Sequence, residues 1–282
     1  VSSNLGPERG LIEDDLLGNG REKYDPVQDV VVNDGNVVVP VDLRYFGHWL
    51  RLLMGSAATT GSEAPYIHTF TSGAQALPSA AIETQLPDVP SIEMNYGNRV
   101  NTIQISMQRS GLLNATVEMV GKGANARAAA STAGSLANVL GLKRFRQATG
   151  RIKRNDSVLG SITRAQFTMS NQLDKVETIQ PDGEIEDADP GQFMVSGSIT
   201  ARYDSTTLHD DAIDGTPVDL EFDWVISAEE TLVVPMPRVF LPVVKTPDEG
   251  PGGVLAAADF MGSGQTAPAV TAVLTNDVAA YA

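Results

Sequence analysis

The chain has 282 residues, and its 35 acidic and 20 basic side chains give a net charge of −15 at pH 7. The apolar fraction of 42% is too high for a disordered chain, and this length can bury a core as one large all-β domain or two smaller ones. The absence of cysteine excludes disulfides, cysteine-ligated zinc and a thiol nucleophile, and the acidity argues against wrapping nucleic acid by phosphate neutralisation.

Residues 1–26 are weakly periodic and predict an extended N-terminal arm with one short apolar patch at Leu11, Ile12, Leu16 and Leu17. Two β-branched runs follow, Val27–Val32 and Val37–Val41, and Asn33-Asp34-Gly35-Asn36 between them predicts a hairpin turn. No window approaches about 18 consecutive apolar residues, so no membrane insertion is expected. The first ten residues also lack a signal-peptide pattern.

One amphipathic helix is predicted next. Asp42 is a favourable N-cap, and Leu43, Phe46, Leu50 and Leu53 follow helical spacing up to a stop at Gly55. We expect this helix to pack on a sheet. A loop over 56–65 and a strand over Tyr66–Thr71 follow.

Four later segments alternate apolar and polar residues with a period of two: Arg99–Gln108, Leu112–Gly121, Ile162–Ser170 and Phe193–Tyr203. This pattern predicts an antiparallel sheet with one face in water. The apolar set is expected to face the interior of a sandwich. Its main members are Ile103, Ile105, Met107, Val117, Phe167, Met169 and Ile199.

The polar set consists mostly of Ser, Thr, Gln and Asn, whereas an ordinary solvated sheet face is rich in Lys and Glu. Two interpretations stay open from the pattern alone: the solvated face of a β-sandwich, or a water-filled lumen that must not hold what passes through it. The set comprises Thr102, Gln104, Ser106, Gln108, Asn114, Thr116, Glu118, Arg164, Gln166, Thr168, Ser170, Ser196, Ser198, Thr200 and Arg202.

A faint internal repeat joins these segments. Residues 100–107 match 162–169 in register, and 112–119 resemble 194–201 in pattern. The repeat suggests a duplicated β module spanning 66–122 and 150–227. The Ala-, Ser- and Gly-rich stretch 123–142 between the modules predicts a flexible excursion or a short helix.

The rest of the chain predicts an acidic loop at 181–191, a short capped helix at 206–214 and two strands. In Val218–Ser227, Leu220, Phe222, Trp224 and Ile226 are expected to point inward and Asp219, Glu221 and Asp223 outward. The prolines of Leu232–Val244 predict an edge strand or extended segment. The Gly/Ala/Pro-rich residues 246–282 predict a C-terminal arm with one strand at Ala269–Thr275, which leaves 27–245 as the main domain.

No catalytic motif is present. The three histidines, His48, His68 and His209, lack metal-ligand spacing, and the metalloprotease, phosphate-loop and nucleophile-elbow patterns do not occur. The acidic loop lacks the spacing of a calcium loop. We therefore expect no enzyme activity, no metal and no cofactor.

Many short blocks, in order, resemble the tail tube proteins of long-tailed bacteriophages and related prophages. The resemblance spans roughly residues 10–245. Its blocks include Leu16-Leu-Gly-Asn-Gly-Arg, Val37-Val-Val-Pro-Val-Asp-Leu-Arg, Trp49-Leu-Arg-Leu-Leu-Met-Gly, Pro65-Tyr-Ile-His-Thr-Phe-Thr-Ser-Gly, Ser106-Met-Gln-Arg-Ser-Gly-Leu-Leu and Glu177-Thr-Ile-Gln-Pro-Asp-Gly.

The resemblance implies a structural virion protein of the tail, assembled in the bacterial host cytoplasm as stacked hexameric rings through which double-stranded DNA passes. Each subunit would give four strands to a central β-barrel, with a second sheet and the helix outside. The implied partners are further copies of the chain and the tape measure, tail terminator and distal tail proteins. The arm, the excursion and the acidic loop become candidates for ring stacking, the loop through Asp182, Glu184, Glu186, Asp187 and Asp189.

Two other functions stay open. A terminator or distal tail protein would share the ring, but a terminator ring should not stack indefinitely. A secreted β-sandwich that binds or hydrolyses polysaccharide needs an aromatic platform or paired acids. At 6% aromatics, with Trp49 and Trp224 as the two tryptophans, this chain has little from which to build one.

Overall fold

The computed structural model describes residues 2–16, 18, 20–86, 88–89, 91–134, 139–202, 207–243 and 255–281. The helices are α1 (Phe46–Met54) and α2 (Thr207–Asp214), with a 3-10 turn at Gln147–Thr149. The strands are β1 (Ser2–Ser3), β2 (Gly6–Ile12), β3 (Val27–Pro40), β4 (Ala58–Thr60), β5 (Tyr66–Thr71), β6 (Ala80–Leu86), β7 (Ser91–Gln108), β8 (Asn114–Gly121), β9 (Gly123–Ala124), β10 (Gly150–Arg154), β11 (Ser157–Val158), β12 (Ile162–Ser170), β13 (Asp174–Val176), β14 (Asp187–Asp189), β15 (Met194–Arg202), β16 (Val218–Ser227), β17 (Glu230–Phe240), β18 (Leu255–Gly262) and β19 (Thr271–Asn276).

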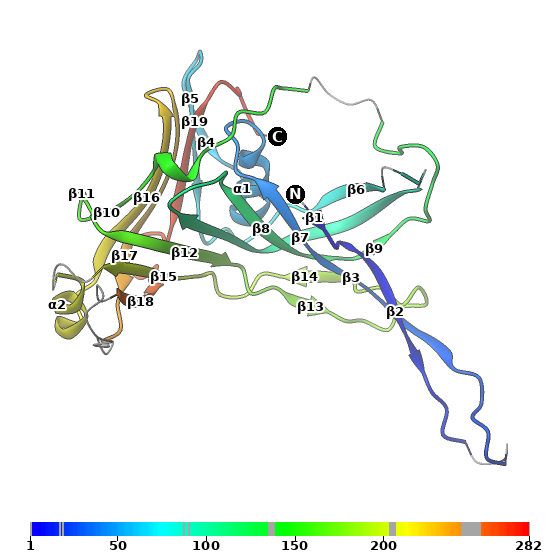
Figure 1. The fold of residues 1–282 in the computed structure, drawn as a ribbon. Helices are drawn as coiled ribbons and strands as arrows, with labels where there is room; N and C mark the ends of the chain where they lie inside the picture. Colours follow the sequence, from blue (N-terminus) through cyan, green and yellow to red (C-terminus); the bar gives the residue numbers. More distant parts are fainter. Residues whose placement is uncertain are drawn as a thin grey trace.

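The expected all-β fold is confirmed, with antiparallel pairing throughout the described strands. One layer has the strand order β3–β8–β7–β12–β15–β18, and the other has the order β10–β16–β17–β19–β5–β4. Figure 1 shows the strands of the second layer crossing those of the first at a steep angle. The short β17–β18 pairing joins the two layers at one corner.

The core lies between the layers and holds the predicted apolar set. Ile103, Ile105, Phe167 and Val117 are all fully buried. The Phe167 ring lies 4.7 Å from the Phe222 ring of the opposite layer, measured between centroids. Alternation therefore predicted correctly which side of these strands is buried.

Helix α1 packs at the end of this core against β5 and β7. The N-cap predicted at Asp42 is wrong, because Tyr45 holds the N-cap position without a side-chain capping bond; Asp42 Oδ1 instead accepts hydrogen bonds from the backbone N–H groups of Arg44 and Tyr45 in the turn before the helix. These bonds stabilise an irregular turn, so the helix begins at Phe46, later than the sequence suggested, and ends at Gly55 with a positive φ of 89°. The short helix predicted at 206–214 is also present as α2.

The hairpin turn predicted at residues 33–36 is wrong. β3 runs straight through this segment and pairs with β8 from Asn33 to Pro40. Its hairpin partner is β2 instead, which pairs with the first half of β3 in a long arm that projects from the body (Figure 1). Gly35 lies opposite Leu5 of the neighbouring β1–β2 segment rather than in a turn, and a Cβ there would lie 2.5 Å from the Leu5 Cα.

Asp223 lies on the outward side of β16 as predicted, opposite to the core residues Phe222 and Trp224, but its side chain is buried. It accepts two hydrogen bonds from Arg151 of the neighbouring strand β10 and contacts the Lys153 ammonium at 2.9 Å. The hydrogen bond to Asp223 raises the pKa of Arg151. The pKa of Lys153 is raised by Glu221 first and by Asp223 second. These paired charges offset the cost of burying a carboxylate.

Pro235 and Pro237 of β17 lie in a short stretch where, among the described residues, only one edge of the strand is paired with a neighbouring strand. β17 pairs with β16 along one edge, but its other edge meets β19 at residues 231–233 and β18 at 239–240. Pro235 and Pro237 lie between these two contacts. The prediction of edge character is therefore correct for this stretch.

The C-terminal residues belong to the body rather than to an arm. β18 pairs with β15, and β19, which matches the predicted strand at 269–275, pairs with β5 and β17. Val270, Leu274 and Tyr281 are buried. The predictions that fall on Leu17, Tyr203 and residues 244–254 lie outside the described residues, as do residues 135–138 of the predicted excursion.

Candidate functional site

The predicted polar residues lie on four strands that are neighbours in one sheet, in the order β8, β7, β12, β15. Their pairing places them side by side in rows across the sheet. The rows are Glu118–Thr102–Ser170, Thr116–Gln104–Thr168–Ser196, Ser106–Gln166–Ser198 and Gln108–Arg164–Thr200. Asn114 and Arg202 continue the same alternation at the strand ends.

This surface, here called the polar face, is the side of the sheet that points away from the core. Each of its fifteen residues is half-buried or exposed, whereas the residues between them, such as Ile105 and Phe167, are buried. A slip of one residue in any strand would put that strand's apolar set in water. The structure therefore brings all the predicted residues together on one face.

The polar face carries few charges, and those it has are segregated. Glu118 lies in the row at one end and accepts a hydrogen bond from the Thr102 hydroxyl at 3.1 Å. Arg164 and Arg202 lie at the opposite end of the strands. On these four strands, the rows between them present only hydroxyl and amide groups, which can exchange hydrogen bonds with water but provide no fixed positive charge for a polyanion.

The sheet is wider than the four predicted strands. β3 flanks β8, and β18 flanks β15 so that Asp259 and Met261 lie beside Ser198 and Ser196. Sequence reasoning missed these two residues because it assigned their segment to an arm. The run of small residues in Leu255–Gly262 hides the alternation that identified the other strands.

The two halves of the polar face have the same internal register. In the first hairpin Ile103 pairs with Val117, and in the second Ala165 pairs with Ile199. Those pairs are equivalent under the repeat that matches 100–107 with 162–169 and 112–119 with 194–201. The equivalent residues Ile105 and Phe167 also face each other across the β7–β12 pairing.

The acidic loop forms the hairpin β13–β14 and lies at the Glu118 end of the strands. Two of the five candidate acids bind the chain's own body: the Tyr96 hydroxyl donates to Glu184 at 2.5 Å, and Arg99 donates to Asp187 at 2.8 Å. The hydrogen bond to Glu184, with burial second, raises the pKa of Tyr96 to about 12. The other three, Asp182, Glu186 and Asp189, are exposed.

The surroundings of His48 and His68 are typical of residues with a structural role. His68 is fully buried and hydrogen-bonds Thr59 Oγ1 and the Val278 carbonyl. Burial, with the nearby Arg51 charge second, lowers the pKa of His48. Among the described residues, no group of three or more His, Asp or Glu side chains is placed to hold a metal ion. No described helix has the length and apolarity needed to span a membrane.

A family model described as phage tail tube protein covers residues 2–262, which include the projecting arm, both halves of the polar face and β18. The comparison with curated proteins finds no match. Because the family model spans nearly the whole chain, the protein belongs to the phage tail tube protein family.

Proposed function

We propose that this protein forms the tube of a phage tail as hexameric rings that stack into a channel for genomic DNA. In this proposal the polar face lines the channel. With at least four strands from each of six subunits, the barrel would contain about 24 strands or more, wide enough to hold water rather than a core. Closure would also remove the free sheet edges that otherwise favour aggregation.

The observation that carries the proposal is the composition of the polar face. DNA has about one charge per 1.7 Å of axis, so a wall of lysine or arginine would bind it and slow its passage. The hydroxyl and amide groups of the central rows offer only weak, exchangeable contacts. An ordinary solvated sheet face would gain solubility from charges, which these rows lack on the four predicted strands; the flanking Asp259 of β18 is acidic and would not bind phosphates.

The proposal also covers domain organisation and partners. The matching register of the two hairpins supports a duplicated module within residues 66–122 and 150–227. The arm and the exposed acids of the β13–β14 hairpin are the candidates for contacts between rings. At its ends the tube would meet terminator and distal tail proteins, with the tape measure protein inside until DNA enters.

Electron microscopy of the purified chain tests this function. We expect concentration-dependent rings or tubes with a central hole, because ring stacking is a heterologous contact that does not close along the axis. Deletion of residues 1–20 should leave folded subunits but impair stacking. Rings that never stack would favour a terminator-like role, and a strict monomer at high concentration would contradict the proposal.

A further inference from the structure

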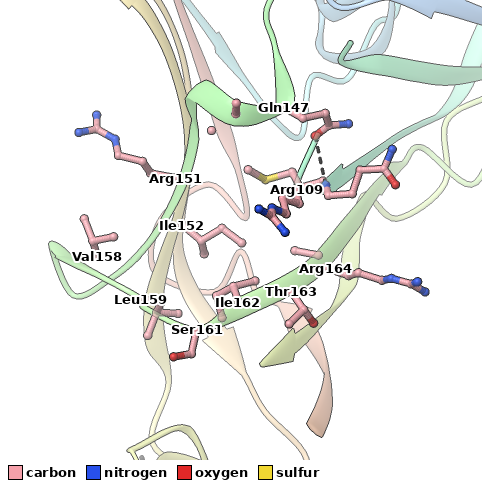
Figure 2. A pocket seen from close by; sticks show the side chains of 15 residues that line it. Arg109, Gln147, Arg151, Ile152, Val158, Leu159, Ser161, Ile162, Thr163 and Arg164 are labelled. Carbon is pink, nitrogen blue, oxygen red and sulfur yellow. Dashed lines mark hydrogen bonds between the residues drawn. The ribbon is translucent and has the colours of Figure 1, made fainter. Parts of the chain in front are cut away.

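A cavity of about 290 Å³ opens at the arginine end of the polar face, between the start of β12 and the β10–β11 hairpin (Figure 2). Aliphatic side chains from three strands line it, among them Ile152, Val158 and Ile162. Val158 is 59% exposed, so part of this apolar lining faces water in the single chain. Exposed apolar surface of this kind marks an interaction site when a partner of suitable chemistry is present.

Three arginines are among the residues that line this cavity, and the lining includes no Asp or Glu. Figure 2 shows Arg109 in the middle of the lining side chains, whereas the side chains of Arg151 and Arg164 extend outward on opposite sides. Arg151 is already paired with Asp223, and Arg109 and Arg164 have no carboxylate partner among the described residues. The cavity therefore combines an aliphatic lining with unpaired positive charge, which fits an occupant that carries both aliphatic groups and carboxylates.

The tip of the β2–β3 arm has this chemistry. Residues 11–16 read Leu-Ile-Glu-Asp-Asp-Leu, and Leu11, Ile12 and Leu16 are each more than half exposed. Asp14 and Asp15 have no cationic partner among the described residues, whereas Glu13 is paired with Lys23. An exposed segment this apolar is expected to be covered in the assembled protein.

The arm tip and the cavity lie on opposite sides of one molecule, as Figure 1 shows for β2 and for the β10–β11 hairpin. The tip therefore cannot fill the cavity of its own chain. In a head-to-tail contact between identical subunits, however, opposite ends meet. A second copy of the chain is thus the partner whose charge and apolar surface match this site.

We propose that the cavity lined by Arg109, Arg164 and Val158 receives the arm tip, residues 11–16, of a neighbouring copy of this chain. This inference rests on the proposed tube function and specifies one of its subunit contacts. The carboxylates of Asp14 and Asp15 would pair with the two arginines, and the leucines would cover the aliphatic lining. Complementary charge of this kind also fixes orientation, because a reversed contact would place like charges together.

Cysteine cross-linking tests the contact directly, since the chain has no cysteine of its own. We expect tubes of the Leu16→Cys plus Val158→Cys variant to form a ladder of disulfide-linked multimers on oxidation. The matched control, Leu16→Cys plus Ile67→Cys, uses another exposed apolar residue on β5 and should give no ladder. Absence of the ladder from tubes of the test variant, or an equal ladder from the control, would overturn the proposal.

Charge reversal gives an independent test. We expect Arg109→Glu plus Arg164→Glu to form rings but to need at least about tenfold more protein to form tubes, because like charges then face each other. Asp14→Arg plus Asp15→Arg should have the same effect, and all four changes in one chain should restore stacking. The control Arg127→Glu plus Lys143→Glu changes the net charge equally at exposed sites outside the cavity.

The outcomes separate this inference from the function on which it depends. If the wild-type chain forms no rings or tubes, the proposed function fails. If wild-type tubes form and the arginine variant stacks normally, only this contact is wrong. The same conclusion follows if Asp182→Cys, in the acidic hairpin, cross-links to Val158→Cys in place of Leu16→Cys, since the occupant would then be a different segment.

Discussion

Replacing Phe167 by alanine tests which side of the four-stranded sheet is the core. Its ring is fully buried and lies 4.7 Å from the Phe222 ring and 6.4 Å from the Trp224 ring, between centroids. Removing a phenylalanine side chain from a packed core costs about 3–5 kcal/mol of unfolding free energy. The adjacent Gln166 points to the polar face, so Gln166→Ala should change that free energy by less than about 0.5 kcal/mol.

Urea unfolding followed by tryptophan fluorescence measures this difference, because Trp224 lies beside the substituted ring. We expect a lower midpoint for Phe167→Ala with an unchanged slope, which is the signature of a loss of stability without a change in the surface exposed on unfolding. The reasoning would be refuted if Phe167→Ala cost less than about 1 kcal/mol, or if Gln166→Ala cost as much as Phe167→Ala.

Three further predictions address the channel, the helix and the acidic hairpin. Lysines in place of Thr102, Gln104 and Ser106 should allow assembly but slow genome delivery, because they would bind DNA phosphates; an unchanged rate of DNA release from such phages would contradict this. Gly47→Ala should lower the unfolding free energy by about 1–3 kcal/mol, because the added Cβ would lie 2.2 Å from the Tyr281 ring. In the control Gly160→Ala the added Cβ would have no neighbouring atom within 4 Å, so the same urea titration should show a clearly smaller loss. In the folded protein the pKa of Tyr96 is raised from 10.0 to about 12, so the stability contributed by its hydrogen bond to Glu184 should be complete below pH 10 and lost as the pH rises toward 12. Tyr96→Phe should flatten the plot of unfolding free energy against pH in this range. An unchanged plot would show that the bond does not contribute.

Alternation predicted the strands of the polar face well because burial on one side is a local, repeated constraint. The expected strand Ile162–Ser170 matches β12 at both ends. The order of the strands could not be predicted in this way. β7 pairs with β12 across more than fifty residues of intervening chain, and nothing in either segment alone specifies that partner.

The hairpin turn predicted wrongly at residues 33–36 shows that tertiary structure can override a favourable local turn sequence. Asn-Asp-Gly-Asn is a favourable turn sequence, but here the backbone of Leu5 on the neighbouring strand approaches Gly35 so closely that this position needs a residue without a side chain. Asp42 was recognisable as a residue that bonds the backbone just ahead of it, since it accepts from residues two and three positions later, although the N-cap of α1 is Tyr45. Local chemistry was therefore reliable where its partners were also local.

The burial of Asp223 and the pairing of the C-terminal strands could not be predicted for the same reason, since their partners are distant in sequence. Asp223 pairs with β10, some seventy residues earlier, whose Arg151 and Lys153 make burial of the carboxylate tolerable. β18 has a composition typical of a linker, yet it pairs with β15 over seven residues. This pairing adds Asp259 to the polar face, which sequence reasoning could not include.

The most direct test of the central claim is a reconstruction of assembled tubes by electron cryo-microscopy. The account predicts a continuous β-barrel around a central hole, with Thr102, Gln104, Ser106 and Gln166 pointing into the hole and Ile105 and Phe167 between the sheets. Tubes in which those polar side chains lie on the outer surface, or are buried between sheets, would contradict it.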